Sequence, residues 1–104
     1  MTHATNLTIA ALSERDANMI GRNALDAAVL GYMNVAALRQ HIMPTERIHG
    51  IFLKGGEKPN IVPRETEMDW YVRSNTINTL QPLKQRVAAC LEGGAHAAGC
   101  HMHL

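Results

Sequence analysis

Four segments of the chain are predicted to be β-strands, three of them because apolar and polar residues alternate with a period of two. They are residues 6–12, 48–54, 66–72 and 100–104. The first reads NLTIAAL and places Leu7, Ile9 and Ala11 on one face. The third contains the run Trp-Tyr-Val, whose residue types favour strands. We therefore expect a sheet of four strands.

A helical period follows the first predicted strand. Asn23 is a candidate N-cap, and Asp26 places negative charge near the positive end of the helix. We expect this helix to end near His41, because Pro44 cannot continue it. The predicted buried stripe comprises Leu25, Ala28, Val29, Tyr32, Ala36 and Arg39.

A second helix is predicted from the cap-type residues at 74–79 to about Ala98. We expect Pro82 in its first turn, since a proline further inside removes a hydrogen bond. The Gly93–Gly94 pair weakens the helix by about 1 kcal/mol per glycine relative to alanine, and Gly99 suits the position after its end. The predicted buried stripe comprises Leu80, Leu83, Val87 and Leu91.

The predicted order of elements is β-α-β-β-α-β, which is the ferredoxin-like order. We therefore expect an α+β fold, with a four-stranded antiparallel sheet that carries two helices on one face. The other face would be open or covered by a partner. With 104 residues and no repeats or linkers, residues 1–104 are expected to form a single domain.

The loop between the second and third strands contains more turn-forming residues than a simple hairpin needs. It combines two glycines and two prolines, Gly55, Gly56, Pro59 and Pro63, with Asn60. These residues restrict the backbone and present the Asn60 amide in a set direction. The residues alone leave a second interpretation open, in which Asn60 serves only its own turn.

Composition and charge exclude several classes of protein. The net charge is +1 and no basic stripe is visible, so we expect no nucleic-acid partner. No run of about 18 apolar residues predicts a membrane span, and the N-terminus shows no secretory signal pattern. Two cysteines do not make a disulfide framework, so a cytoplasmic location is expected.

A metal site near the C-terminus is the main alternative use of the histidines. His96, Cys100, His101 and His103 are close in sequence. In a strand, however, His101 and His103 share a face that Cys100 does not, which leaves two ligands where a structural zinc needs four. We therefore predict no metal site, and we interpret Cys100 and Cys90 as small buried hydrophobic residues.

Three stretches resemble a known metalloenzyme family. They are GRNALDAAVLGYMNVAALRQHI, ERIHGIFLKGGEKPNIVPRETEMDWYVRS and LQPLKQRVAACLEGGAHAAGC, which together cover about residues 21–100. The paired glycines, the Asn-Ile-Val-Pro run and the arginine that ends the next strand are similar to the lid domain of aminoacylases, glutamate carboxypeptidases and p-aminobenzoyl-glutamate hydrolases.

The resemblance implies a hydrolase with two domains and two zinc ions. The large domain of such enzymes holds the zinc ions (or similar divalent metals) and hydrolyses an amide bond of N-acyl or N-aroyl amino acids. The inserted lid has the β-α-β-β-α-β order and mediates dimerisation, so the expected partners are the chain's own catalytic domain and a second copy, which would pair through an edge strand or the sheet.

The resemblance also implies roles for individual residues. Asn60 and Arg73 match substrate-binding positions of the family, some of which act across the dimer. An arginine can grip a carboxylate through two hydrogen bonds, and an amide can donate to a carboxylate or an oxyanion. Gly55 and Gly56 supply only backbone freedom. Without the resemblance, Arg73 would be an ordinary surface arginine that pairs with Asp69 or Glu67.

Two departures from the family pattern limit these expectations. The chain lacks the clustered zinc ligands of the large domain, so it should be inactive alone and needs no cofactor of its own. The segment AALSERDANMIG after the first strand lacks the family's histidine, so we predict no catalytic residue. The alternative is a self-standing ferredoxin-like regulatory module that binds an amino acid at a dimer interface.

Overall fold

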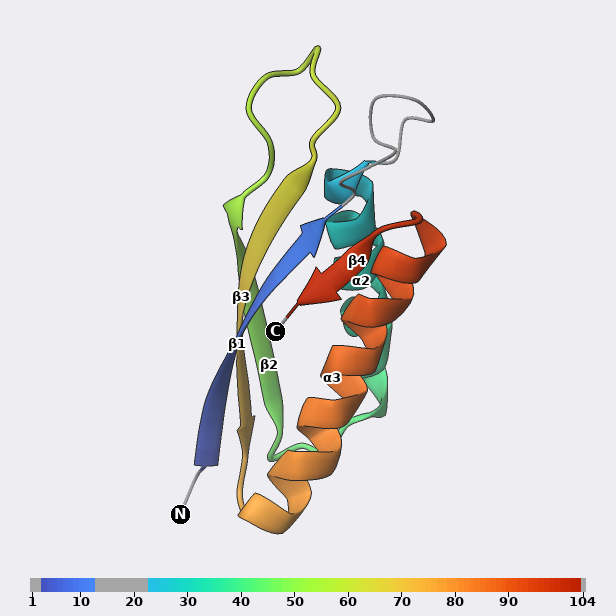
Figure 1. Ribbon diagram of the computed structural model, residues 1–104. Helices are drawn as coiled ribbons and strands as arrows, with labels where there is room; N and C mark the ends of the chain where they lie inside the picture. The colour runs from blue at the N-terminus through green and yellow to red at the C-terminus, as the bar shows by residue number, and fades with distance from the viewer. Residues whose placement is uncertain (1–2, 13–22, 104) are drawn as a thin grey trace.

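The computed structural model describes the backbone of residues 3–12 and 23–103, and the side chains of residues 23–102. Leu104, the last residue of the predicted fourth strand, lies outside the described residues. The elements are β1 (His3–Leu12), α2 (Ala24–Leu38), a 3-10 helix η2 (Arg39–His41), β2 (Arg47–Lys54), β3 (Glu65–Ser74), α3 (Ile77–Ala97) and β4 (His101–His103), as Figure 1 shows.

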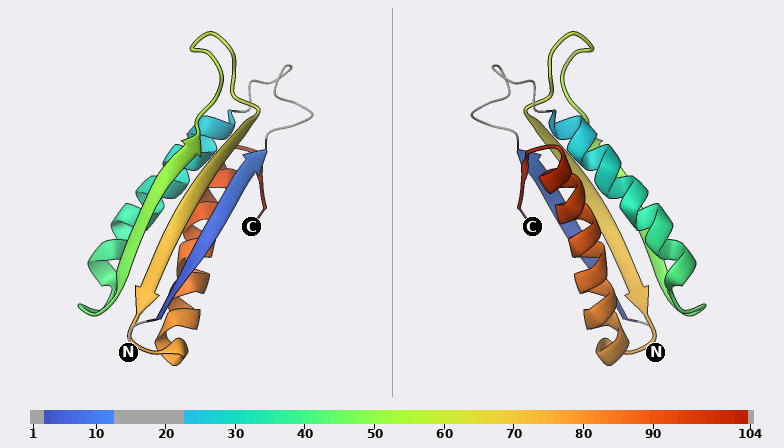
Figure 2. Two further views of the ribbon diagram at one scale, coloured as in Figure 1. Left: turned by 90° about the vertical axis from the view of Figure 1, so that its left-hand side faces the viewer. Right: turned by 90° about the vertical axis from the view of Figure 1, so that its right-hand side faces the viewer.

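The described strands form one antiparallel sheet in the order β2-β3-β1-β4. Helices α2 and α3 both lie on the same side of this sheet (Figure 2). The predicted α+β class is therefore confirmed. The register pairs Leu7 with Trp70 and Ile9 with Met68, so the apolar positions predicted for the first strand oppose buried positions of β3.

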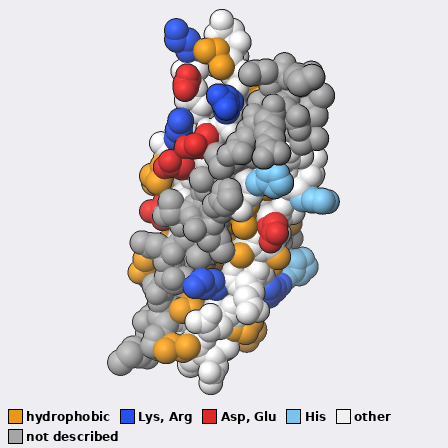
Figure 3. All heavy atoms as spheres, in the orientation of Figure 1, with side chains coloured by type: hydrophobic (Ala, Val, Ile, Leu, Met, Phe, Trp, Pro, Cys, Tyr) orange, Lys and Arg blue, Asp and Glu red, His pale blue; other side chains and the backbone are white. Residues whose placement is uncertain are grey.

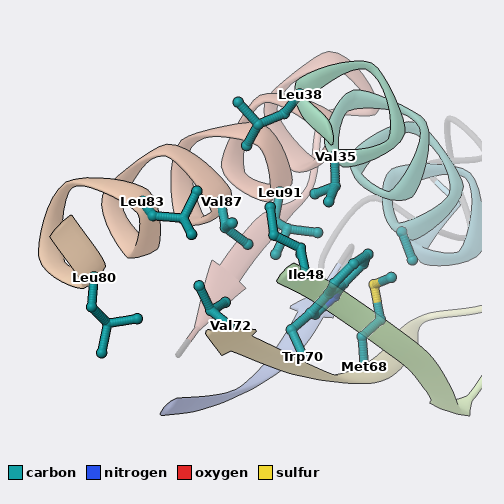
Figure 4. Close-up of a cluster of buried hydrophobic side chains, with 11 residues drawn as sticks. Val35, Leu38, Ile48, Met68, Trp70, Val72, Leu80, Leu83, Val87 and Leu91 are labelled. Atoms are coloured by element: carbon teal, nitrogen blue, oxygen red, sulfur yellow. The ribbon is translucent and has the colours of Figure 1, made fainter. Parts of the chain in front are cut away.

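The core lies between the sheet and the two helices (Figure 4). Trp70 is fully buried at the centre of this core. The centroid of the Tyr32 ring lies 5.4 Å from the centroid of the Trp70 ring. The main cluster comprises Ala28, Val35, Leu38, Ile48, Met68, Trp70, Val72, Leu80, Leu83, Val87 and Leu91. All four residues of the predicted α3 stripe belong to this cluster, which confirms that prediction.

The predicted buried stripe of α2 was partly wrong. Val29 is 44% exposed, whereas the small residues Ala24, Ala27 and Gly31 are buried. The apolar residues of α2 surround most of the helix, so periodicity alone did not identify the covered side. Small residues face inward because α3 approaches too closely for larger side chains.

The point of closest approach between the helices is a pair of glycines. A Cβ on Gly94 would lie 2.3 Å from the backbone nitrogen of Gly31 and 2.6 Å from the carbonyl oxygen of Ala27. A Cβ on Gly31 would lie 3.1 Å from Leu91. Close packing of α2 and α3 therefore requires glycine at position 94. The sequence predicted only that this glycine weakens the helix.

The beginning of α3 also differs from the prediction. Thr76 caps the helix by accepting a hydrogen bond from the backbone of Thr79 at 3.2 Å, so the helix begins at Ile77. Pro82 is therefore its sixth residue and lies in the second turn rather than the first. Because proline has no N–H, the Asn78 carbonyl lacks its usual helical hydrogen bond.

The end of α3 agrees with the prediction for Gly99. Its φ of 72° lies in the left-handed region that favours glycine. The Gly99 N–H donates to the His96 carbonyl at 3.1 Å, and the Cys100 N–H donates to the Ala95 carbonyl at 2.7 Å. This pair of bonds is a Schellman motif, and it turns the chain sharply from α3 into β4.

Candidate functional site

The loop between β2 and β3 is held to the body of the domain at its base. The Ala24 N–H at the start of α2 donates to the Pro63 carbonyl at 2.9 Å, and Thr66 donates its hydroxyl to the Ala24 carbonyl at 3.0 Å. Asn23 in turn caps α2, with its side-chain oxygen accepting from Leu25 at 2.8 Å. The loop therefore extends from an anchored base beyond the end of the sheet (Figure 1).

The tip of the loop presents Asn60. The Ile61 N–H donates to the Lys58 carbonyl at 3.2 Å and closes a turn with Pro59 and Asn60 at its centre. Asn60 is exposed, and no described non-glycine residue has a positive φ. An unusual turn backbone therefore does not explain Asn60. Within the part of the chain that the structure describes, its amide makes no hydrogen bond.

The two glycines at the start of the loop differ in their requirements. Gly56 has a φ of 130°, and a Cβ there would lie 3.0 Å from the Pro63 ring. Gly55 has no positive φ, and a Cβ on it would meet only Leu25, at an ordinary 3.8 Å. Only Gly56 therefore needs the conformational freedom that was predicted for both.

Arg73 is the ninth residue of the ten in β3, so it lies within the strand rather than after it. Its register partners are Ala4 in β1 and Arg47 in β2. The guanidinium carbon lies 5.2 Å from the centre of the Tyr71 ring. Among the described residues Arg73 has no ion pair, so the ordinary pairing with Asp69 or Glu67 does not occur.

Asn60 and Arg73 lie toward opposite ends of the sheet. The loop leads into β3 at Glu65, and Arg73 lies eight residues further along that strand. At about 3.3 Å per residue, the strand alone separates them by roughly 26 Å. One copy of the chain therefore does not bring both side chains to the same small substrate.

Exposed apolar side chains that the sequence did not predict occur on β2 and α2. Strand β2 is an edge of the sheet, and α2 lies beside it (Figure 2). We call the exposed apolar residues of these two elements the apolar edge: Val29, Leu30 and Met33 of α2, and Ile51, Phe52 and Leu53 of β2. In β2, Phe52 points to the side of the sheet that carries α2, whereas Ile51 and Leu53 point to the opposite side. The three consecutive apolar residues at 51–53 break the alternation that was predicted for residues 48–54, and this run was the signal of exposed apolar side chains in the sequence.

Charged side chains show no comparable grouping. On the described part of the face in Figure 3, Lys, Arg, Asp and Glu are interspersed rather than gathered by sign. No helix of the described residues is long and apolar enough to cross a membrane.

Comparison with known proteins shows which enzymes the chain is similar to. No family profile matches the chain. Over 84 residues, 81% of this chain, it is 48% identical to the Xaa-Arg dipeptidase of Mus musculus. Over 77 residues, 73% of this chain, it is 35% identical to a p-aminobenzoyl-glutamate hydrolase of Escherichia coli K12. A dinuclear metal binding peptidase of the M20 family from Bacillus subtilis superimposes with a TM-score of 0.68 over 98% of this chain at 15% identity, which shows the fold alone.

The chain fits a small domain of this family of amidohydrolases and metallopeptidases. It spans about a fifth of the dipeptidase, 20%, and 16% of the Escherichia coli hydrolase. In the Bacillus subtilis peptidase it corresponds to 24% of the chain. These proportions fit one small domain of a larger enzyme.

The described residues contain no group of three or more His, Cys, Asp or Glu side chains that could hold a metal ion. Cys100 is buried and packs with Ala27 and Ala95, as predicted for a small hydrophobic residue, whereas His101 is exposed. Residues 13–22, which include most of the segment without the family's histidine, lie outside the described residues.

Proposed function

We propose that this chain is the lid domain of a zinc-dependent amidohydrolase, and that it closes over a metal site in a catalytic domain outside these 104 residues. The observation that carries the proposal is the match of most of the chain to a fifth or less of two hydrolases. The substrate class is an N-acyl or N-aroyl amino acid or a dipeptide. Two zinc or similar divalent ions would activate water in the catalytic domain, and the isolated chain would be inactive.

The fold proposal is a ferredoxin-like arrangement. The strand order, read as β4-β1-β3-β2, together with the β-α-β-β-α-β sequence of elements, supports it. This topology leaves β2 as an edge strand, with unpaired backbone groups that can accept a strand from a second copy.

Asn60 and Arg73 would bind the substrate from two different subunits. If β2 pairs antiparallel with β2 of a second copy, the pairing reverses the ends of the sheet. Arg73 is level with Arg47 at the start of β2, and the loop of the partner subunit begins after Lys54 at the end of its β2. Arg73 and the end of the partner subunit's β2 are then about two strand spacings apart, roughly 10 Å. The dimer would thus bring together groups that a single chain holds apart.

The apolar edge supports this mode of association. Pairing of the two β2 strands would cover Ile51, Phe52 and Leu53 and bring the exposed side of α2 against its counterpart. Sedimentation velocity of the 104-residue chain should therefore show a dimer that Ile51→Lys disrupts. Ile77→Lys is the matched control, because Ile77 is similarly exposed, 55% against 60%, but lies at the start of α3. A chain that stays monomeric at high concentration would contradict the dimer.

The role of Asn60 is tested in the intact enzyme that contains this domain. Asn60→Ala should lower kcat/KM by about 100-fold, the loss typical of an oxyanion donor. Asn75→Ala is the control, since Asn75 is exposed but lies beyond β3. An unchanged kcat/KM in Asn60→Ala would overturn this role. Hydrolysis of an amide by the isolated chain with added zinc would contradict the lid proposal itself.

A further inference from the structure

We propose that Tyr71 is a positioning residue that holds the Arg73 guanidinium ready for an anionic group of the substrate. The inference rests on the proposed function of Arg73, but the contact between Tyr71 and Arg73 is present in this chain. Tyr71 and Arg73 are two residues apart in β3, so their side chains leave the same face of the sheet. The guanidinium carbon of Arg73 lies 5.2 Å from the ring centre, within the range of a cation–π contact.

The surroundings of Arg73 explain why it needs such a support. Its cross-strand neighbour in β2 is Arg47, and like charges directly opposite each other in a sheet repel. The Arg47 side chain donates hydrogen bonds to the carbonyls of Pro44 and Glu46. Arg47 is thereby fixed in its own loop, and the Tyr71 ring is the contact that remains for Arg73 among the described residues.

The ring orients the arginine without consuming its hydrogen-bonding capacity. A carboxylate partner would occupy the guanidinium donors and compete with the substrate, whereas a ring contacts only the guanidinium face. A long arginine side chain also loses considerable rotamer freedom when it binds a ligand. Stacking removes part of that freedom beforehand, so binding to a prepared Arg73 costs less.

The stacking itself is tested in the 104-residue chain by NMR of the Arg73 Nε–H group. In the wild type and in Tyr71→Phe, the ring current should shift this resonance upfield. In Tyr71→Leu it should move to the position of a free arginine. An unchanged resonance in Tyr71→Leu would overturn the contact. Fluorescence of Trp70, the single tryptophan, checks that each variant keeps its core.

The positioning role is tested by kinetics of the intact enzyme. Tyr71→Leu should raise KM about two- to fivefold with kcat unchanged, the factor that corresponds to an exposed cation–π contact, and Tyr71→Phe should restore it. In an Arg73→Gln background the same Tyr71→Leu change should have no further effect. An additive effect in that background would contradict the role of Tyr71.

The same series separates the two proposals. If Arg73→Gln leaves KM unchanged, the proposed binding role of Arg73 fails, whatever Tyr71 does. If Arg73→Gln raises KM while Tyr71→Leu does not, the role of Arg73 stands and the positioning role of Tyr71 is wrong.

Discussion

Replacement of Gly94 by alanine tests whether the two helices are packed as closely as the structure shows. In an isolated helix this change would stabilise by about 1 kcal/mol, because alanine is the better helix former. In this fold the new methyl group would lie 2.3 Å from the nitrogen and 2.7 Å from the Cα of Gly31, and 2.6 Å from the carbonyl oxygen of Ala27. All three atoms belong to the backbone of α2, so no side chain can rotate away.

The size of the effect follows from the overlap. Non-bonded heavy atoms prefer separations of about 3.5 Å or more, so the helices would have to move apart by roughly 1 Å. Overpacking of a buried site costs about 1–3 kcal/mol. A rigid contact between backbones lies at the upper end of that range, which exceeds the gain in helix propensity. We therefore expect Gly94→Ala to destabilise the domain by about 1–2 kcal/mol, or roughly 5–15 °C in Tm.

Gly93→Ala is the matched control, one residue away in the same helix. Gly93 is exposed, and a Cβ on it would meet only the Asn34 side chain at 3.5 Å. The propensity gain should then appear undiminished, as a stabilisation of up to about 1 kcal/mol. Thermal and urea unfolding followed by circular dichroism measures both variants. Equal stabilisation by Gly93→Ala and Gly94→Ala would refute the close approach of α2 and α3.

Three further predictions concern the sheet, a helix cap and a thiol. Gly50→Ala should destabilise the domain by about 1–3 kcal/mol and change the tryptophan emission, because the new Cβ would lie 2.4 Å from the Trp70 ring; urea unfolding followed by fluorescence measures both. Asn23→Ala should cost about 1 kcal/mol in urea unfolding, since the side chain accepts two backbone hydrogen bonds, and Asn23→Ser should retain most of the stability. Burial raises the pKa of the Cys90 thiol, although Arg86 partly offsets it, so iodoacetamide should modify Cys90 more slowly in the folded chain than in urea. Because the pKa of the Cys90 thiol is higher in the folded chain than in the unfolded chain, deprotonation of this thiol favours unfolding. The free energy of unfolding should therefore be unaffected below the unfolded pKa and should fall as pH rises through the folded pKa, a loss that Cys90→Ala should not show.

Much of the secondary structure was predictable because its causes are local. Asn23 and Thr76 cap their helices through residues two or three positions away, and Gly99 ends α3 through bonds within a single turn. The α3 stripe was predictable because its apolar residues occupy one face only. Pro82 was misplaced because the cap-type residues at 74–79 allow several starting points, and the hydrogen bond between Thr76 and Thr79 selects an early one.

Some features of the candidate site were likewise predictable from the sequence, and others were not. Sequence resemblance selected Asn60 and Arg73, and composition alone predicted a stiff loop around Asn60. The separation of these residues by most of a strand was already implied by the predicted elements but became plain only with the register. The stacking of Arg73 on Tyr71 was not predicted, because side-chain direction at the end of a strand depends on neighbours in another strand, here Arg47.

The sequence by itself determined the order of the elements, the cap of α2, the end of α3 and the family that the chain resembles, since these depend on neighbouring residues or on matching motifs. Only the tertiary structure decided which side of α2 is buried, why Gly94 must be glycine and where the apolar edge lies. Those features depend on distances between α2 and α3 or on the position of β2 at the edge of the sheet. Such contacts join residues far apart in the chain, and local hydrophobic patterns do not record them.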